Sequence, residues 1–179
     1  VSLTHDDSEV FSTPGTGEFD DALLGVYDRE AAARSTAIDA TTTASSAEIG
    51  VRGVLVHPST TRARQDHVYV AVDGRPVRNA RLRRAVVEVY GALLPDDRAP
   101  IAVVSVSLPT AWADHNVHPR KREVRLRDAE AVASAIASTV GDALSTADVR
   151  HAESLSTDLD ASLEPLEGTD SDFTDARVL

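Results

Sequence analysis

Cysteine and methionine are absent from this chain of 179 residues, and lysine occurs only once. Without cysteine the chain can form neither disulfides nor thiolate metal sites. No run of apolar residues is long enough to cross a bilayer, and the first residues lack the features of a signal peptide. We therefore expect a cytoplasmic protein without membrane contact. The chain starts with valine, so we also expect it to be a piece of a longer protein.

The charge of the chain is strongly acidic and unevenly placed. The net charge is -11, and all bases except Lys121 are arginine. An acidic, lysine-poor composition is typical of proteins from a salty cytoplasm, although a GC-rich genome would produce a similar bias. The middle of the chain, residues 52–127, is basic at +7, whereas residues 1–51 carry -8 and residues 128–179 carry -10. This basic middle is a candidate surface for an anion such as phosphate.

Apolar residues make up 42% of the chain, which is enough for one folded domain, predicted over residues 1–145. Beyond residue 145 the composition turns to Ser, Thr, Asp and Glu. Such a segment cannot bury a core, so residues 146–179 are predicted to form a disordered acidic linker.

Hydrophobic periodicity and turn residues predict an α+β order of elements. In chain order we first expect a hairpin over 1–13, a helix over 19–34 and strands over 36–43 and 48–57. A strand over 67–72 should then turn at Asp73-Gly74 into a short return strand over 75–77, followed by a helix over 79–94. A strand over 100–108, an edge strand over 123–126 and a helix from Asp128 to about 145 should complete the order.

The predicted core follows from which residues share a face. The strand over 48–57 should place Ile49, Val51, Gly53 and Leu55 on one face, and Arg52, Val54 and Val56 on the other. The helix capped by Asn79 should bury Leu82, Val86, Val89, Tyr90 and Leu93. The last helix should bury Val132, Ala135, Ile136, Val140 and Leu144. Trp112 is expected to serve packing.

Three stretches of the sequence resemble the MutL family of DNA mismatch-repair proteins. Residues 116–126, NVHPRKREVRL, resemble the family signature N-V-H-P-x-K-x-E-V-R-[FL]. Residues 70–78, VAVDGRPVR, resemble its F-V-N-G-R-x-[VI]-[RK] segment, and residues 89–95 resemble the stretch between the two. The chain departs from the family pattern at Asp73, where asparagine is usual, and at His115, where an apolar residue is usual. We expect these departures to affect only local packing.

The resemblance implies a fold and a role. The fold would be the second, transducer domain shared by MutL and gyrase B within the GHKL ATPases, a mixed β-sheet with helices on one face. The longer protein would bind ATP and Mg²⁺ in an N-terminal ATPase domain, dimerise on binding, contact DNA, and relay mismatch recognition from a MutS-type protein to nucleases. The nucleotide-binding motifs would precede Val1, so this chain alone should bind no cofactor and should not hydrolyse ATP.

Lys121 is the one residue to which the resemblance assigns a catalytic and cofactor-binding role, at the γ-phosphate of ATP in the neighbouring domain. A compact ammonium on a flexible stem can reach a phosphate as a point charge, whereas a planar guanidinium has a different shape. The simpler explanation is that Lys121 is one surface cation in a basic run.

The arginines on and near the helix over 79–94 are the predicted DNA contacts: Arg75, Arg78, Arg81, Arg83 and Arg84. Arg62, Arg64 and Arg98 lie nearby in sequence and could add to them. Together these side chains could follow a phosphate backbone. They could equally be a solvated helix face balanced by acids. No aromatic residues alternate with the arginines, which argues against stacking on single strands.

Other chemistries find little support in the sequence. His115 and His118 stand three apart near Asp114, but a loop before a proline is a poor frame for a tetrahedral site, so no metal is expected. The alternatives to a MutL transducer are the equivalent domain of a type II topoisomerase, whose Q-T-K loop is absent here, and a stand-alone nucleic-acid-binding module, which the net charge of -11 disfavours.

Overall fold

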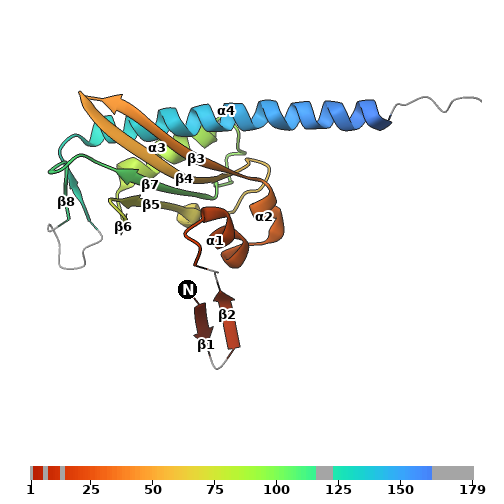
Figure 1. Ribbon diagram of the computed structural model, residues 1–179, viewed down its shortest axis with the longest axis horizontal. Coiled ribbons are helices and arrows are strands. Elements are labelled where there is room, and N and C mark those ends of the chain that lie inside the picture. The colour runs from red at the N-terminus through yellow and green to blue at the C-terminus, as the bar shows by residue number, and fades with distance from the viewer. Residues whose placement is uncertain (1, 6–7, 13–14, 116–122, 163–179) are drawn as a thin grey trace, which may run out of the picture. The chain divides into compact units, whose positions relative to one another are not determined.

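Figure 1 shows the computed structural model, which describes residues 2–5, 8–12, 15–115 and 123–162. The chain divides into two units, Val1–Ala147 and Asp148–Leu179. The first unit holds every strand and the packed core, and it is the unit described below.

The N-terminal segment forms the predicted hairpin. Strands β1 (Ser2–His5) and β2 (Ser8–Ser12) pair antiparallel, with Ser2 opposite Ser12. Beyond it the chain enters two short helices, α1 (Phe19–Val26) and α2 (Arg29–Ala33).

The single helix predicted over 19–34 is wrong, because the chain breaks at Tyr27 and Asp28. Tyr27 ends α1 with extended backbone angles, and the carboxylate of Asp28 accepts a hydrogen bond from the backbone N–H of Ala31 at 2.7 Å. An aspartate in this position satisfies the free N–H groups at a helix start. Asp28 therefore begins a second helix where apolar periodicity alone indicated a continuous one.

Five strands form a mixed sheet in the order β3-β4-β7-β5-β6. Their bounds are β3 (Ser35–Ala44), β4 (Ala47–Val56), β5 (Val68–Val72), β6 (Arg75–Val77) and β7 (Ala102–Ser107). Strands β5 and β7 are parallel and the other pairs are antiparallel. The α+β class and the mixed sheet are as predicted.

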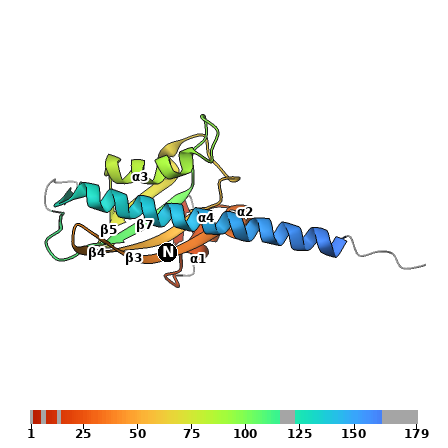
Figure 2. The same ribbon diagram turned by 90° about the horizontal axis from the view of Figure 1, so that it is seen from above.

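The two long helices cover one face of this sheet. Figures 1 and 2 show α3 (Ala80–Gly91) side by side with the part of α4 (Ala129–Ser162) that belongs to the first unit, up to Ala147. The main core lies between them and the predicted inward face of β4, since Ile49, Val51 and Leu55 are fully buried there. The five residues predicted to point inward from α4 are all buried as well.

The opposite face of the sheet is covered only in part, at the end where α1 and α2 lie. A second cluster joins Leu23 and Ala31 of these helices to Val54 and Val56, the outward residues of β4, and to Ile101. The alternation predicted for β4 is therefore confirmed, although both of its faces are buried toward this end. The short helices add to the predicted fold, in which helices occupied one face.

Helix α3 follows the prediction at its start and departs from it at its end. The side chain of Asn79 accepts hydrogen bonds from the backbone N–H groups of Arg81 and Leu82, as a helix cap does. Leu82, Val86 and Tyr90 are buried, and Val89 is partly buried. Leu93 was predicted to be buried but is 44% exposed, because α3 ends at Gly91 and Leu93 no longer lies on its stripe.

Helix α4 runs to Ser162, well past the end predicted near residue 145. No glycine or proline occurs between residues 142 and 164, so nothing in the backbone chemistry stops the helix there. The described residues are helical over 146–162, where disorder was predicted, and residues 163–179 lie outside the described residues. Low apolar content reports burial rather than helix formation, so it gave no signal for this part of α4.

Candidate functional site

The site is built at the sheet edge where the parallel strands β5 and β7 both end. Strand β5 turns into β6 at Asp73-Gly74, and both residues have positive φ, 49° and 74°. This is the tight turn that an Asp-Gly pair favours. The backbone N–H of Asp73 donates to the carbonyl of Val106 at 2.8 Å, and the N–H of Leu108 donates to its carboxylate at 2.9 Å. Asp73 thus joins the turn to the end of β7.

Beyond β7 the chain forms a small hairpin that frames the predicted motif. Strands β8 (Ala113–Asp114) and β9 (Arg125–Leu126) pair antiparallel, with Asp114 opposite Arg125. The N–H of Arg127 donates to the carbonyl of Trp112 at 2.9 Å, and the Trp112 side chain is buried, as expected for a packing role. β9 lies within the predicted edge strand, whereas β8, only two residues long, was not predicted.

Lys121 falls between these strands. Segment 116–122, which contains Lys121 and the whole N-V-H-P-x-K motif, lies outside the described residues. The part of the chain around it is described on both sides: His115 follows β8, and Val124, which packs partly against the main core, precedes β9. The role of Lys121 stays a prediction.

His115 is the unexpected residue of this edge. Its side chain is only 14% exposed, and both ring nitrogens are buried without a hydrogen-bond partner among the described residues. Its Nε2 lies 3.8 Å from the carboxylate of Asp73. Asp73 and His115, the two departures from the family pattern, thus lie close to each other. The sequence analysis expected them to affect only local packing and did not predict that they meet.

The five predicted DNA-contact arginines do not behave alike. Arg81 forms an ion pair with Glu130 of α4. Arg78 and Arg83 line one surface hollow of about 790 Å³ beside the end of β6. Arg75 and Arg84 are exposed. Within the described ranges, Arg75, Arg78, Arg83 and Arg84 have no carboxylate in ion-pair distance, and Arg78 and Arg83 come together at the hollow.

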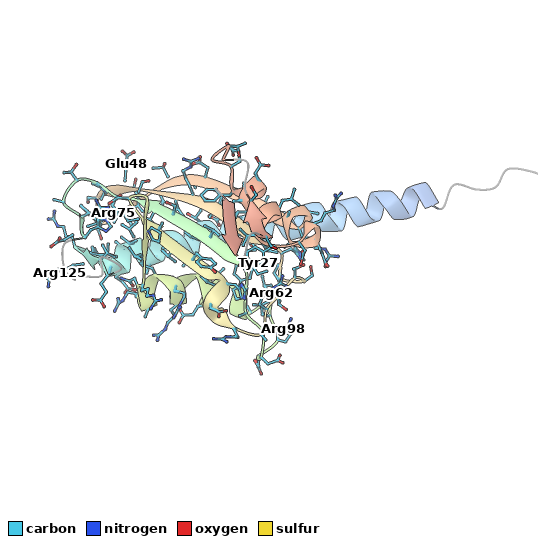
Figure 3. The ribbon with its side chains drawn as sticks, turned by 90° about the horizontal axis from the view of Figure 1, so that it is seen from below. Tyr27, Glu48, Arg62, Arg75, Arg98 and Arg125 are labelled. Carbon is cyan, nitrogen blue, oxygen red and sulfur yellow. The ribbon has the colours of Figure 1, made fainter. Side chains whose placement is uncertain are left out.

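Arg62 and Arg98 lie at the opposite end of the domain and have contacts of their own. Figure 3 shows Arg62 and Arg98 with Tyr27 at one end and Arg75 with Arg125 at the other. Arg62 lies 3.4 Å from Asp28 and with its guanidinium carbon 5.7 Å from the centre of the Tyr27 ring. Arg98 donates to Thr61 at 2.7 Å. Arg62 therefore ties its loop to Asp28 at the start of α2, and Arg98 contacts the same loop at Thr61. Neither arginine extends the group of arginines on α3.

A row of polar side chains also contacts this loop, which comprises residues 57–67. The hydroxyl of Tyr27 lies 2.9 Å from Nδ1 of His67, whose Nε2 lies 3.4 Å from Asp66. Burial raises the pKa of Tyr27 to about 12, with Tyr69 as a second cause, so its hydroxyl keeps its proton at ordinary pH. The backbone N–H of Ala31 is the main cause that lowers the pKa of Asp28, with Arg62 contributing. We interpret this cluster as structural, because its contacts hold residues 57–67 in place.

Two features are missing from the part of the chain that the structure describes. Within these ranges no helix is apolar and long enough to span a bilayer. Nor does this part of the chain bring three or more potential metal-ligating side chains together.

Comparison with known proteins decides the family. Residues 23–145 match the family model described as "DNA mismatch repair protein, C-terminal domain". The chain belongs to this DNA mismatch-repair family. It is 46% identical over 144 residues to the DNA mismatch repair protein MutL of Halobacterium salinarum, covering 80% of this chain and 21% of that protein. It is 39% identical to MutL of Pelotomaculum thermopropionicum, covering 75% and 22%.

The fold also has a solved counterpart. A crystal structure described as the N terminal domain of a DNA repair protein superposes with a TM-score of 0.65 at 22% identity, covering 79% of this chain and 45% of that one. At this identity the likeness supports the fold alone. The chain spans about a fifth of the length of the MutL relatives that it matches.

Proposed function

We propose that this chain is the transducer part of a MutL-type mismatch-repair ATPase. In this proposal it follows an N-terminal ATPase domain of the same chain that binds ATP and Mg²⁺. It couples ATP binding to homodimerisation and passes the signal of a MutS-type protein to nucleases. The family match supports the repair context, and the solved DNA-repair domain supports the fold. The matches to MutL proteins favour this proposal over a topoisomerase domain or a stand-alone module.

The framing of Lys121 is the observation that carries the proposal. Asp114 and Arg125 are paired in register, so the described residues on the two sides of segment 116–122 lie next to each other. Buried groups hold both sides, Trp112 before the segment and the partly buried Val124 and Leu126 after it. A lysine presented between fixed ends can reach a phosphate outside its own domain, and an ammonium there would interact more strongly with ATP than with ADP.

The decisive experiment compares Lys121→Ala with Arg122→Ala in the full-length protein. Both remove one positive charge from the same segment, so general electrostatics change equally. Lys121→Ala should slow ATP turnover and weaken ATP-driven dimerisation measured by sedimentation, whereas Arg122→Ala should do neither. Lys121→Arg should be intermediate, because the charge survives and the geometry does not. Equal activity of Lys121→Ala and wild type would remove the proposed role.

The isolated chain should neither hydrolyse ATP nor bind it at sub-millimolar concentration. One lysine cannot hold a nucleotide whose base and Mg²⁺ sites lie elsewhere. Isothermal titration calorimetry of ATP into the 179-residue chain tests this, and a clear sub-millimolar isotherm would contradict it.

We also propose that the basic surface of α3 and β6 contacts DNA backbone in the longer protein. Arg75, Arg78, Arg83 and Arg84 support this because they are free of carboxylate partners among the described residues, whereas Arg81 shares its charge with Glu130. Each phosphate contact that is lost should reduce the salt dependence of binding by about 0.9 in the log–log slope.

The DNA proposal is tested with two double variants of equal charge. Arg78→Gln with Arg83→Gln removes two cations from the hollow beside β6, and Arg29→Gln with Arg52→Gln removes two from α2 and β4. Only the first pair should weaken binding to duplex DNA and flatten its salt dependence. Equal losses for both pairs would mean that net charge, and not this surface, governs binding.

A halophilic source and a cytoplasmic location stay predictions. The acidic, lysine-poor composition and the similarity to a Halobacterium MutL support the former.

A further inference from the structure

We propose that Asp73 and His115 form a positioning pair that fixes the chain where it enters the Lys121 segment. Neither residue belongs to the motif that points to Lys121, and the pair is defined by described atoms alone. The effect of the pair on ATP binding rests on the role proposed above for Lys121, whereas the pair itself does not depend on that role.

Asp73 is held before it meets His115. It sits in a tight turn at a φ of 49°, its N–H donates to Val106, and one carboxylate oxygen accepts from Leu108 at 2.9 Å. Both partners are backbone groups at the end of β7, in the middle of the sheet. The second carboxylate oxygen is the one that lies 3.8 Å from His115, so one carboxylate connects the sheet to the imidazole.

His115 needs a partner at its position. A buried imidazole with neither nitrogen in a hydrogen bond is costly, because those nitrogens lose water on folding. Among the described residues the Asp73 carboxylate is the charged group within ion-pair distance of the imidazole. Asp114, the preceding residue, has contacts of its own.

The location of the pair decides what it positions. His115 directly follows β8, so it is the first residue after Asp114, the last residue paired with β9. After segment 116–122, Val124 packs against the core. Before it, Trp112 and the two-residue strand β8 are held in place, and the contact with Asp73 would extend this anchoring to His115, the last described residue before the segment.

The first test uses limited trypsin digestion of the 179-residue chain, with fragments identified by mass spectrometry. The sequence offers cleavage after Arg120, Lys121 and Arg122, and Arg98 in an exposed loop serves as an internal reference. Asp73→Asn keeps an oxygen for Leu108 but removes the charge facing His115. It should speed cleavage after residues 120–122 by about three- to fivefold relative to Arg98, the range expected for a partly buried ion pair.

A matched control and a double variant separate the pair from general effects. Asp39→Asn removes one partner of the exposed Asp39–Arg52 ion pair of 3.2 Å on β3 and β4, and it should leave cleavage after 120–122 unchanged. His115→Leu should speed cleavage as Asp73→Asn does, and the double variant should be no faster than either single one. Additive effects, or no effect of Asp73→Asn, would overturn the proposed pair.

The second test asks whether the pair acts through Lys121 in the full-length protein. Asp73→Asn should weaken binding of a non-hydrolysable ATP analogue about three- to fivefold and leave ADP binding unchanged. In a Lys121→Ala background it should have no further effect. Equal loss of analogue and ADP binding would mean that Asp73 only stabilises the fold. If Lys121→Ala itself binds the analogue normally, the role of Lys121 fails while the digestion result for the pair still stands.

Discussion

Gly53 in β4 is the position where the smallest side chain should do the most damage. It lies opposite Val104 of β7 and Ile38 of β3 in the middle of the sheet. A Cβ added at Gly53 would lie 2.0 Å from the backbone oxygen of Val103 and 3.0 Å from its carbonyl carbon. Because the obstacle is backbone, no rotamer change can relieve it, and β4 would have to move away from β7.

The expected cost follows from what such a movement disrupts. Overpacking in a tight core costs about 1–3 kcal/mol, and each ladder hydrogen bond that is lost adds about 1 kcal/mol. Gly53→Ala should therefore lower the free energy of unfolding by about 3 kcal/mol or more, a large part of the total of about 5–15 kcal/mol for a typical domain.

Urea unfolding followed by the fluorescence of Trp112, the single tryptophan, measures this directly. Gly50→Ala is the matched control, since Gly50 also lies in β4 opposite β7, but its added Cβ would meet Ser107 at 3.4 Å, an ordinary contact. It should change stability by less than about 1 kcal/mol. A Gly53→Ala protein within about 1 kcal/mol of wild type would refute the reasoning, because it would mean that β4 and β7 separate easily.

Three further changes test smaller features by denaturant or thermal unfolding. Tyr90→Phe removes the buried hydroxyl that donates to the carbonyl of Val56 at 2.8 Å, and it should cost about 1–3 kcal/mol; no measurable loss would mean that water reaches that carbonyl. Ser46→Gly should raise stability by about 0.5–1 kcal/mol, because Ser46 has a φ of 62°, where glycine is at ease; a loss of stability would contradict this. The backbone N–H of Ala131 is the main cause that lowers the pKa of Asp128, so its charge stabilises the fold above its unfolded pKa of about 3.9 and this contribution is lost as pH falls through the lower folded pKa. The stability advantage of wild type over Asp128→Asn should therefore shrink in acid, and a pH-independent difference would count against it.

The parts of the fold that the sequence predicted are those that a regular repeat controls. In β4 every second residue faces the main core, and in α3 and α4 every third or fourth does, so burial could be assigned position by position. Caps at Asn79 and Asp128 were readable because the residue type itself favours the end of a helix.

The misses have a common physical origin in contacts between distant residues. Asp28 begins a new helix, and its carboxylate also faces Arg62, a partner that no local pattern reveals. Strand β8 has two residues, too few to show a repeat, and it exists because β9 pairs with it. Asp73 and His115 were each visible as departures from a family pattern, but their contact depends on the ends of β5 and β8 meeting at one edge.

The candidate site was predictable in chemistry and only partly in geometry. A lysine retained alone among arginines, inside a specific motif, was sufficient to single out Lys121. The sequence did not reveal which arginines remain available to a partner, because availability depends on the neighbours of each side chain. Arg81 shares a helix with Arg83 but faces Glu130 of α4, while Arg83 lines an open hollow with Arg78.

This distribution explains how a protein of net charge -11 can keep a usable basic surface. Free charges in water influence each other over a Debye length of about 8 Å at physiological salt, so the acids of distant segments do little to cancel a local group of cations. What cancels a cation is a carboxylate in contact, as at Arg52, Arg62, Arg64 and Arg81. Arg75, Arg78, Arg83 and Arg84 have no such contact among the described residues. If these arginines contact DNA as proposed, no ion pair has to break first, and this local condition matters more for the binding of a phosphate backbone than the total charge does.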